Sequence, residues 1–161
     1  MIMKYLFKTT IISGLVFALG ACSSGNDDEV DEQKPIIVAN YADNAPVSCG
    51  TIKRGTAILF KAKFTDNVSL GSYNIDVHQN FDHHNHDTET SSCTMDPVKP
   101  ATNPFMFNKS FQIPGNPKEF FAEQTINIPG NIQPGDYHFM IKVTDAVGWS
   151  TMRGISIKIT E

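Results

Sequence analysis

Four of the five histidines in this 161-residue chain lie within nine positions, His78 to His86, in the run H-Q-N-F-D-H-H-N-H. Neutral imidazole is the commonest metal-binding side chain in proteins, and Asp82 adds an anionic oxygen donor to the same run. The cluster therefore favours a metal site. The alternative interpretation is a polar surface loop that is rich in histidine by composition alone.

The elements that must position these residues show a hydrophobic period of two, which is typical of strands with one buried face. Each alternating run is bounded by Gly, Pro, Asn or Asp, the residues of turns. We expect strands over residues 56–65, 72–80, 105–113, 120–128, 137–144 and 154–160, with a tight turn over 145–148. Because such strands must bury their apolar faces against one another, we predict an all-β fold, an immunoglobulin-like antiparallel β-sandwich of about seven strands.

The fifth histidine, His138, lies at the beginning of one expected strand, whereas His78 lies near the end of another. These two strands are antiparallel neighbours in an immunoglobulin-like sheet, and both histidines have the outward parity of their strands. Directly opposed residues have Cβ atoms about 4.5–5.5 Å apart, which lets two imidazoles share one ion. We therefore predict that His78 and His138 bind a metal with Asp82, His84 and His86, and that all five histidines converge there.

Residues 81–104 form a long connection between two of the expected strands and carry both the histidines and Cys93. Long loops without structure of their own are usually functional or disordered. Cys49 and Cys93 are an even pair, which in a secreted protein predicts a disulfide that anchors this loop. It would stabilise the fold by roughly 4 kcal/mol in a chain-entropy model. The alternative is that one of the two cysteines is a soft metal ligand.

The beginning of the chain resembles a secretion signal. Lys4 and Lys8 precede an apolar stretch over residues 9–19, which is too short to span a bilayer comfortably. The stretch ends in L-G-A-C, which resembles a bacterial lipobox. We predict a lipoprotein signal peptide over residues 1–21 and lipidation of Cys22. The alternative is an ordinary secretory signal followed by a chance cysteine.

Residues 22–33 are polar, acidic and without aromatic side chains, a composition that cannot bury enough surface to fold. We therefore predict a flexible tether over 22–33 and one folded domain over 34–161. The acidic run also resembles the signal that sends some lipoproteins to the outer face of the outer membrane, although a merely solvated linker fits as well. We expect a lipid anchor in the outer membrane, with the domain on the periplasmic or cell-surface face.

Net charge and motifs exclude some classes of function. Without residues 1–21 the chain has 11 basic and 17 acidic side chains, a net charge of −6, which argues against a nucleic-acid partner. The sequence contains neither a nucleophile elbow nor an H-E-x-x-H motif, so we do not expect an enzyme. Metal-assisted hydrolysis is the minor alternative, because an open site would leave a water molecule on the metal.

Two segments, Y-N-I-D-V-H-Q-N-F-D-H-H-N-H over 73–86 and P-G-D-Y-H-F-M-I-K-V-T-D over 134–145, resemble the lipoproteins grouped as domain of unknown function 4625. The resemblance covers residues 34–161, and the combination of H-x-N-F-D-x-H-x-H with a later G-D-Y-H-F is fairly specific. It implies an extracytoplasmic immunoglobulin-like domain with a metal-binding histidine set, and no established activity.

Carried over position by position, the family pattern matches His78, Asp82, His84, His86 and His138. His83 falls at an open position of the motif and is a lower-ranked additional candidate. Family members often have another histidine shortly before an I-x-I-P strand. Here that region reads F-A-E-Q over 121–124, which makes Glu123 a further candidate ligand.

A few other side chains also have chemistry to offer. Met140 shares the outward parity of His138 and would add a soft sulfur, although an outward methionine is more often plain surface. Asp66, Asp76 and Asp145 suggest calcium. However, Asp66 and Asp145 lie where turns are expected, and the D-x-D-x-D spacing of a calcium loop is absent.

The leading hypothesis is a non-enzymatic lipoprotein that captures or transfers zinc or copper, with an outer-membrane transporter or another envelope protein as partner. The alternative is a binding or adhesion module for a partner protein or glycan, in which the histidine loop is structural. Trp149, Phe105 and Phe107 would then form a contact surface. Their alternative role is packing in the core.

Overall fold

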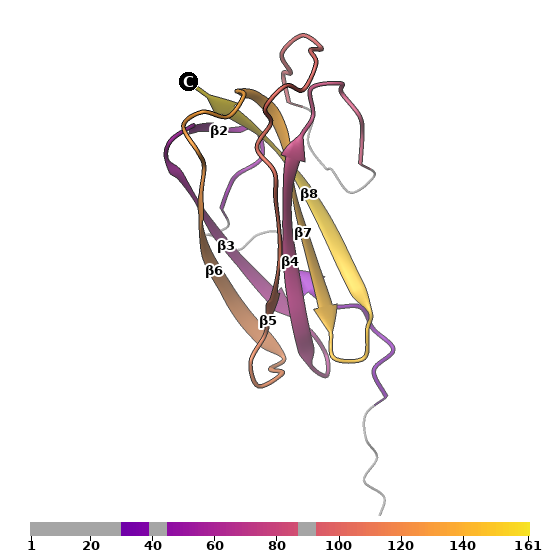
Figure 1. The fold of residues 1–161 in the computed structure, drawn as a ribbon. Helices are drawn as coiled ribbons and strands as arrows, with labels where there is room; N and C mark the ends of the chain where they lie inside the picture. Colours follow the sequence, from indigo (N-terminus) through magenta and orange to yellow (C-terminus); the bar gives the residue numbers. More distant parts are fainter. Residues whose placement is uncertain (1–29, 39–44, 87–92) are drawn as a thin grey trace, which may run out of the picture.

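The computed structural model describes residues 30–38, 45–86 and 93–161, which form eight strands in two packed sheets (Figure 1). The strands are β1 (Ile36–Ile37), β2 (Gly50–Lys53), β3 (Ala57–Thr65), β4 (Leu70–Gln79), β5 (Phe107–Gln112), β6 (Glu119–Asn127), β7 (Gly135–Asp145) and β8 (Ser150–Thr160). One sheet has the order β1-β3-β6 and the other β2-β8-β7-β4-β5. The predicted all-β, two-sheet fold is confirmed. The predicted signal peptide and Cys22 lie outside the described residues.

The structure differs from the expected sandwich in two details. It has eight strands rather than about seven, and β2 runs parallel to its neighbour β8, with Gly50 opposite Ile157. Strand β8 also begins four residues earlier than expected, at Ser150. The segment S-T-M-R does not alternate in hydropathy, so the sequence did not indicate a strand, but its backbone pairs with β7. The described residues contain no helix, so they contain no helix that is long and apolar enough to cross a membrane.

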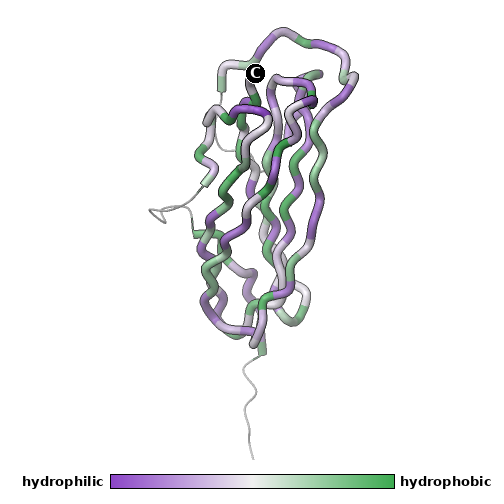
Figure 2. The backbone as a smooth tube through the Cα atoms, turned by 60° about the vertical axis from the view of Figure 1, so that its left-hand side comes forward, coloured by the Kyte–Doolittle hydropathy of each residue, from purple (hydrophilic) through white to green (hydrophobic). Residues whose placement is uncertain are grey.

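Alternation of apolar and polar side chains builds the core between the sheets. Hydropathy alternates along the strands of both sheets (Figure 2), and the inward-facing apolar side chains of β3 are almost completely buried. The Phe60 ring lies 5.8 Å from that of Phe139 and 6.1 Å from that of Tyr73, measured between centroids, so the two sheets meet through stacked aromatic rings. Burial of these large side chains removes apolar surface from water and is the main stabilising term.

Strand β7 lies in the middle of the five-stranded sheet and is buried on both faces. Its inward side chains enter the core, as expected from parity. Its first three outward side chains are also covered: Asp136 is 8 % exposed, Met140 6 % and His138 0 %. The connection after β4 provides part of this cover, because the backbone carbonyl of His84 lies 3.1 Å from the His138 ring.

Both ends of that connection are fastened to β7 and its surroundings. At the near end, the Asn80 amide donates to the carbonyl of Asp136, and the ring of Phe81 packs edge-on against Tyr137. At the far end, the Lys99 amide donates to the carbonyl of Phe81. These contacts hold the histidine segment at the sheet edge, so its position does not depend on the loop alone.

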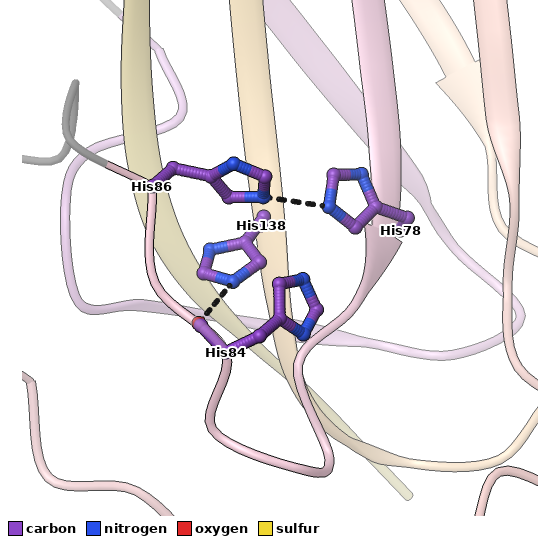
Figure 3. A group of neighbouring side chains, drawn as sticks. All are labelled: His78, His84, His86 and His138. Carbon is purple, nitrogen blue, oxygen red and sulfur yellow. Dashed lines mark hydrogen bonds between the residues drawn. The ribbon is translucent and has the colours of Figure 1, made fainter.

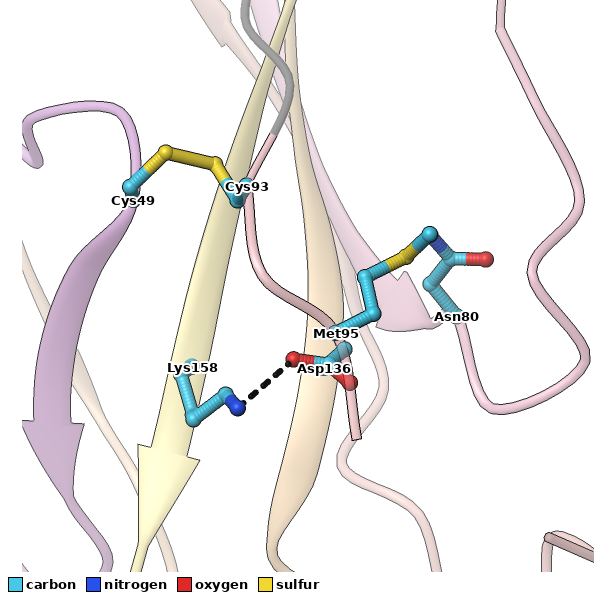
Figure 4. Close-up of a disulfide and its surroundings, with 6 residues drawn as sticks. All are labelled: Cys49, Asn80, Cys93, Met95, Asp136 and Lys158. Carbon is cyan, nitrogen blue, oxygen red and sulfur yellow. Dashed lines mark hydrogen bonds and ion pairs between the residues drawn. A yellow bond between two sulfur atoms is a disulfide. The ribbon is translucent and has the colours of Figure 1, made fainter. Parts of the chain in front are cut away.

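The predicted disulfide between Cys49 and Cys93 is present (Figure 4), with their Cα atoms 5.4 Å apart and a sequence separation of 44. It joins the returning connection to the residue before β2. Three residues beyond Cys93, Asp96 forms an ion pair with Lys158 of β8. The hydrogen bond from Lys158 lowers the pKa of Asp96 below its ordinary value.

We expect the double variant Cys49→Ala, Cys93→Ala to unfold at lower denaturant concentration. A cross-link over a loop of this length is worth about 2–4 kcal/mol, because it removes conformations from the unfolded chain. Mass spectrometry of the non-reduced protein should find one linked pair of peptides, and urea unfolding should show the loss. Two free thiols in freshly isolated protein would contradict the assignment.

Candidate metal centre

The register of two neighbouring strands, β4 and β7, positions two of the imidazoles. His78 of β4 lies directly opposite His138 of β7, as expected from strand parity, and their ring centroids are 5.3 Å apart. Both side chains leave the sheet on its outer face, because Val77 and Phe139 occupy the core side. A rigid antiparallel ladder therefore fixes the spacing of these two imidazoles.

The hydroxyl of Tyr137 holds the beginning of β7 in place. It donates to the carbonyl of Gln133 at 2.5 Å and accepts from the backbone amide of Phe105 at 3.0 Å. Burial raises the pKa of Tyr137, so this hydroxyl keeps its proton. Because His138 is the next residue, the same two hydrogen bonds hold its backbone.

The segment after β4 brings two more imidazoles over the first pair. The rings of His84 and His86 lie 4.7 Å and 4.6 Å from the ring of His138, between centroids. One ring nitrogen from each of His78, His84, His86 and His138 lies within 4.8 Å of all the others. Figure 3 shows the four rings turned toward one another around a common point. The four side chains together can hold a metal ion, and we call them the histidine cluster.

One distance in the histidine cluster matches the needs of a metal. The Nε2 atoms of His78 and His86 are 3.1 Å apart. Two nitrogens on a tetrahedral zinc ion, each about 2.0–2.1 Å from it, are about 3.3 Å apart. A separation of this size accommodates either one shared proton or one shared ion. This pair of nitrogens therefore already has the spacing of two ligands on one ion.

Exposure divides the cluster into a closed side and an open side. His138 is completely buried, whereas the side chains of His78 and His84 are 24 % and 35 % exposed. Beside the open side lies a hollow of about 400 Å³, whose lining includes His78, His86 and Met140. A bound ion would thus rest on a buried imidazole while small molecules reach it from the hollow.

Asp76 is a residue of this site that the sequence interpretation missed. Its Oδ1 lies 2.6 Å from Nδ1 of His78, and its Oδ2 accepts from the side-chain amide of Asn108 at 2.6 Å. An imidazole that donates Nδ1–H to a carboxylate presents Nε2 to a metal, and the carboxylate makes that nitrogen a stronger donor. The signal was in the sequence: a D-x-H pair on one strand places both side chains on the same face.

Asp82 lies beside His84, as Asp76 lies beside His78, and not at the point where the four rings meet. Its Oδ1 lies 2.6 Å from Nδ1 of His84, and that hydrogen bond lowers the pKa of Asp82. Asp82 is outside the group of side chains whose ligand atoms lie within 4.8 Å of one another. We had expected it as a direct ligand, whereas its geometry orients a ligand. A carboxylate two residues before a histidine in a tight loop reaches that ring more easily than a shared ion.

The additional candidates fall outside the histidine cluster. His83 turns away, with its Nε2 2.8 Å from the carbonyl of Asp96, so the expectation that all five histidines converge is wrong. Glu123 lies on β6, in the other sheet, and pairs with Lys61. Met140 is buried and lines the hollow beside His78. Cys49 and Cys93 are joined to each other, which removes them as thiolate ligands.

We expect Asp76→Asn to weaken metal binding about 10- to 100-fold, because a ligand histidine loses the carboxylate that fixes its tautomer and raises its basicity. Isothermal titration with zinc should measure the change. The matched control is Asp96→Asn, which removes the same charge from a carboxylate bound to Lys158. Equal weakening by both variants would mean that only overall charge matters.

A comparison with curated proteins finds no match. A family model described as domain of unknown function 4625 (DUF4625) matches residues 21–160, which include every strand and every residue of the histidine cluster. The match spans far more than half of the chain, so the protein belongs to the domain of unknown function 4625 family.

Proposed function

We propose that this protein is a membrane-anchored lipoprotein that binds zinc or copper outside the cytoplasm and captures the metal or passes it on, without catalysing a reaction. The observation that carries the proposal is the convergence of four imidazoles from β4, β7 and the connection after β4. Nitrogen ligands of this kind suit zinc and copper, whereas calcium and magnesium prefer oxygen.

The half-open geometry supports capture or transfer over a purely structural role. Structural zinc sites are closed by four protein ligands and hold the fold together. Here the strands pair through their backbones and the core forms from apolar side chains, so neither depends on the histidine side chains. Three of the four imidazoles are only partly buried, so a competing ligand from a partner protein can reach the ion. An outer-membrane transporter or another envelope protein is the partner we propose.

The aromatic side chains give the alternative of an adhesion module less support. Phe105 is buried and Phe107 packs against the core. Only Trp149 of the three is substantially exposed, and its indole nitrogen donates to the carbonyl of Asp31. These three residues therefore do not supply a common contact surface.

The experiment that tests the metal proposal is elemental analysis of the full protein, purified in detergent from its native membrane without chelators. We expect close to one equivalent of zinc or copper per chain, removed by a chelator and restored by titration. A protein that contains neither metal and binds neither stoichiometrically would overturn the proposal.

Lipid anchoring is tested separately. We expect Cys22→Ser to abolish labelling with a radioactive fatty acid and to release the protein from the membrane fraction, because the serine hydroxyl does not replace the thiol in lipid transfer. Cys22 follows an apolar stretch and ends the L-G-A-C motif. Ser23→Ala is the matched control and should stay lipidated. Unchanged membrane retention of the Cys22→Ser protein would contradict the anchor.

A further inference from the structure

Three aspartates form a second cluster, at the end of the sandwich opposite the histidines. Asp31 precedes β1, Asp66 follows β3 and Asp145 is the last residue of β7. One carboxylate oxygen from each lies within 4.8 Å of those of the other two. All three residues are buried, with exposed fractions of 9 %, 9 % and 4 %. We call them the aspartate cluster.

Each of the three carboxylates uses Oδ1 to accept hydrogen bonds from backbone amides, and that of Asp31 accepts from the amide of Gln33 at 3.2 Å. Oδ1 of Asp66 accepts from the backbone amides of Val68 and Ser69, both at 2.8 Å. Oδ1 of Asp145 accepts from the amides of three successive residues, Val147, Gly148 and Trp149. These bonds account for the Oδ1 atoms and leave the Oδ2 atoms for another role.

The Oδ2 atoms of all three aspartates are buried and have no hydrogen-bond partner among the described residues. Within residues 30–38, 45–86 and 93–161, no lysine or arginine forms an ion pair with them. A buried carboxylate oxygen without a partner is costly, and three like charges this close repel one another. A cation between the three carboxylates would offset both costs.

The geometry points to a calcium ion bound by Asp31, Asp66 and Asp145. The donors are all carboxylate oxygens, which hard cations prefer to nitrogen. Calcium accepts irregular shells of six to eight oxygens, whereas magnesium demands a near-ideal octahedron and keeps several waters. Asn67, the residue after Asp66, buries an amide oxygen that also has no partner among the described residues, so the same turn offers a neutral oxygen donor.

This ion fastens the first described residues to the body of the sandwich. In Figure 1 the indigo segment that contains Asp31 lies beside the turn between β7 and β8. The segment contributes only the two-residue strand β1 to a sheet, and the Trp149 indole donates to the Asp31 carbonyl at 3.3 Å. With calcium present, three separate parts of the chain share one ion, so the segment becomes part of the folded unit.

Sequence reasoning had grouped Asp66 and Asp145 with Asp76 as a weak hint of calcium. The structure separates Asp76, which binds His78, and puts Asp31 in its place. Asp31 belongs to an acidic run whose composition predicts a solvated tether. Only the three-dimensional arrangement distinguishes it from its acidic neighbours.

The first test uses terbium(III), which replaces calcium in oxygen sites and emits light when a nearby tryptophan is excited. The chain has a single tryptophan, Trp149, whose amide binds Asp145 and whose indole binds Asp31. We expect sensitised emission from full-length protein, and its loss on addition of calcium. Absence of emission, or emission that calcium does not displace, would overturn the proposal.

The second test compares thermal unfolding with and without calcium for wild type and Asp145→Asn. Asparagine retains Oδ1 for the three turn amides but removes one negative charge. At calcium about a hundredfold above the dissociation constant, wild type should melt about 5–10 °C higher than in chelator. Asp145→Asn should melt above wild type in chelator, because repulsion is relieved, and should gain nothing from calcium.

Glu119→Gln is the matched control. Glu119 lies at the same end of the sandwich, opposite Thr65, and pairs with Lys63. This variant should gain as much from calcium as wild type does. If Asp145→Asn does not fold, Asp31→Asn replaces it, since Asp31 lies outside both sheets. An equal calcium shift in wild type and in the aspartate variant would overturn the proposal, whatever the histidine cluster binds.

Discussion

Replacement of His138 by alanine should lower the affinity for zinc or copper by more than about a hundredfold. Loss of an outer-shell partner alone costs about 10- to 100-fold, and His138 is a central member of the cluster rather than an outer partner. It is completely buried, its ring lies under those of His84 and His86, and strand β7 fixes its position. Isothermal titration with each metal should measure the loss.

The controls separate a strand-built site from a loop chelate. His84→Ala should weaken binding as much as His138→Ala, although 54 residues separate the two. His83→Ala should matter little, because that ring binds the Asp96 carbonyl. His138→Gln keeps a donor for the His84 carbonyl and checks that lost binding is not lost folding. The assignment fails if His138→Ala leaves affinity unchanged while the loop variants abolish it.

Phe139→Ala should destabilise the protein by about 3–5 kcal/mol, a large part of the stability of an ordinary domain. The ring is completely buried and stacks on Phe60 between the sheets, so its removal leaves a cavity that the surrounding strands cannot fill. Urea unfolding of the metal-free protein should show the loss as a lower midpoint with an unchanged slope.

The same variant tests whether folding and metal binding are separable. Because Phe139 does not touch the ion, saturating metal should stabilise Phe139→Ala and wild type by equal amounts, about 4 kcal/mol at a thousandfold excess over the dissociation constant. Phe121→Ala is the matched control: that ring is 53 % exposed on β6, and its loss should cost about 1 kcal/mol or less. A smaller metal effect in Phe139→Ala would show that the core and the cluster are coupled.

The sheet and two of the four histidines of the metal centre could be predicted from the sequence. Both depend on the alternation of inward and outward side chains along a strand. Alternation fixes which side chains of β4 and β7 face outward, and antiparallel pairing then places His78 opposite His138. The disulfide was predictable because only two cysteines follow Cys22. In these cases a local pattern has one geometric consequence, so no knowledge of the loops was needed.

The rest depends on where loops return, which local patterns do not specify. His83 and His84 are adjacent and chemically identical, yet the backbone of His83, with φ of 60°, sends its ring to Asp96 instead. Strand β1 has two residues, too few for alternation to reveal it. The aspartate cluster joins residues from three parts of the chain, each of which resembles an ordinary turn or tether residue.

Under the proposed lipid anchor, the direction in which the chain enters the sandwich would set the height of the histidine cluster above the bilayer. Segment 30–38 joins the domain near the end of β7, whereas His78 and His138 lie toward the other end of the ladder. Ten strand residues, the length of β4, span about 33 Å, and a coil over the nine residues from Cys22 to the first described residue would add roughly 17 Å. In the proposed anchored state the ion is thus presented to the aqueous side, on the order of 50 Å from the lipid, where phosphate headgroups do not compete for it.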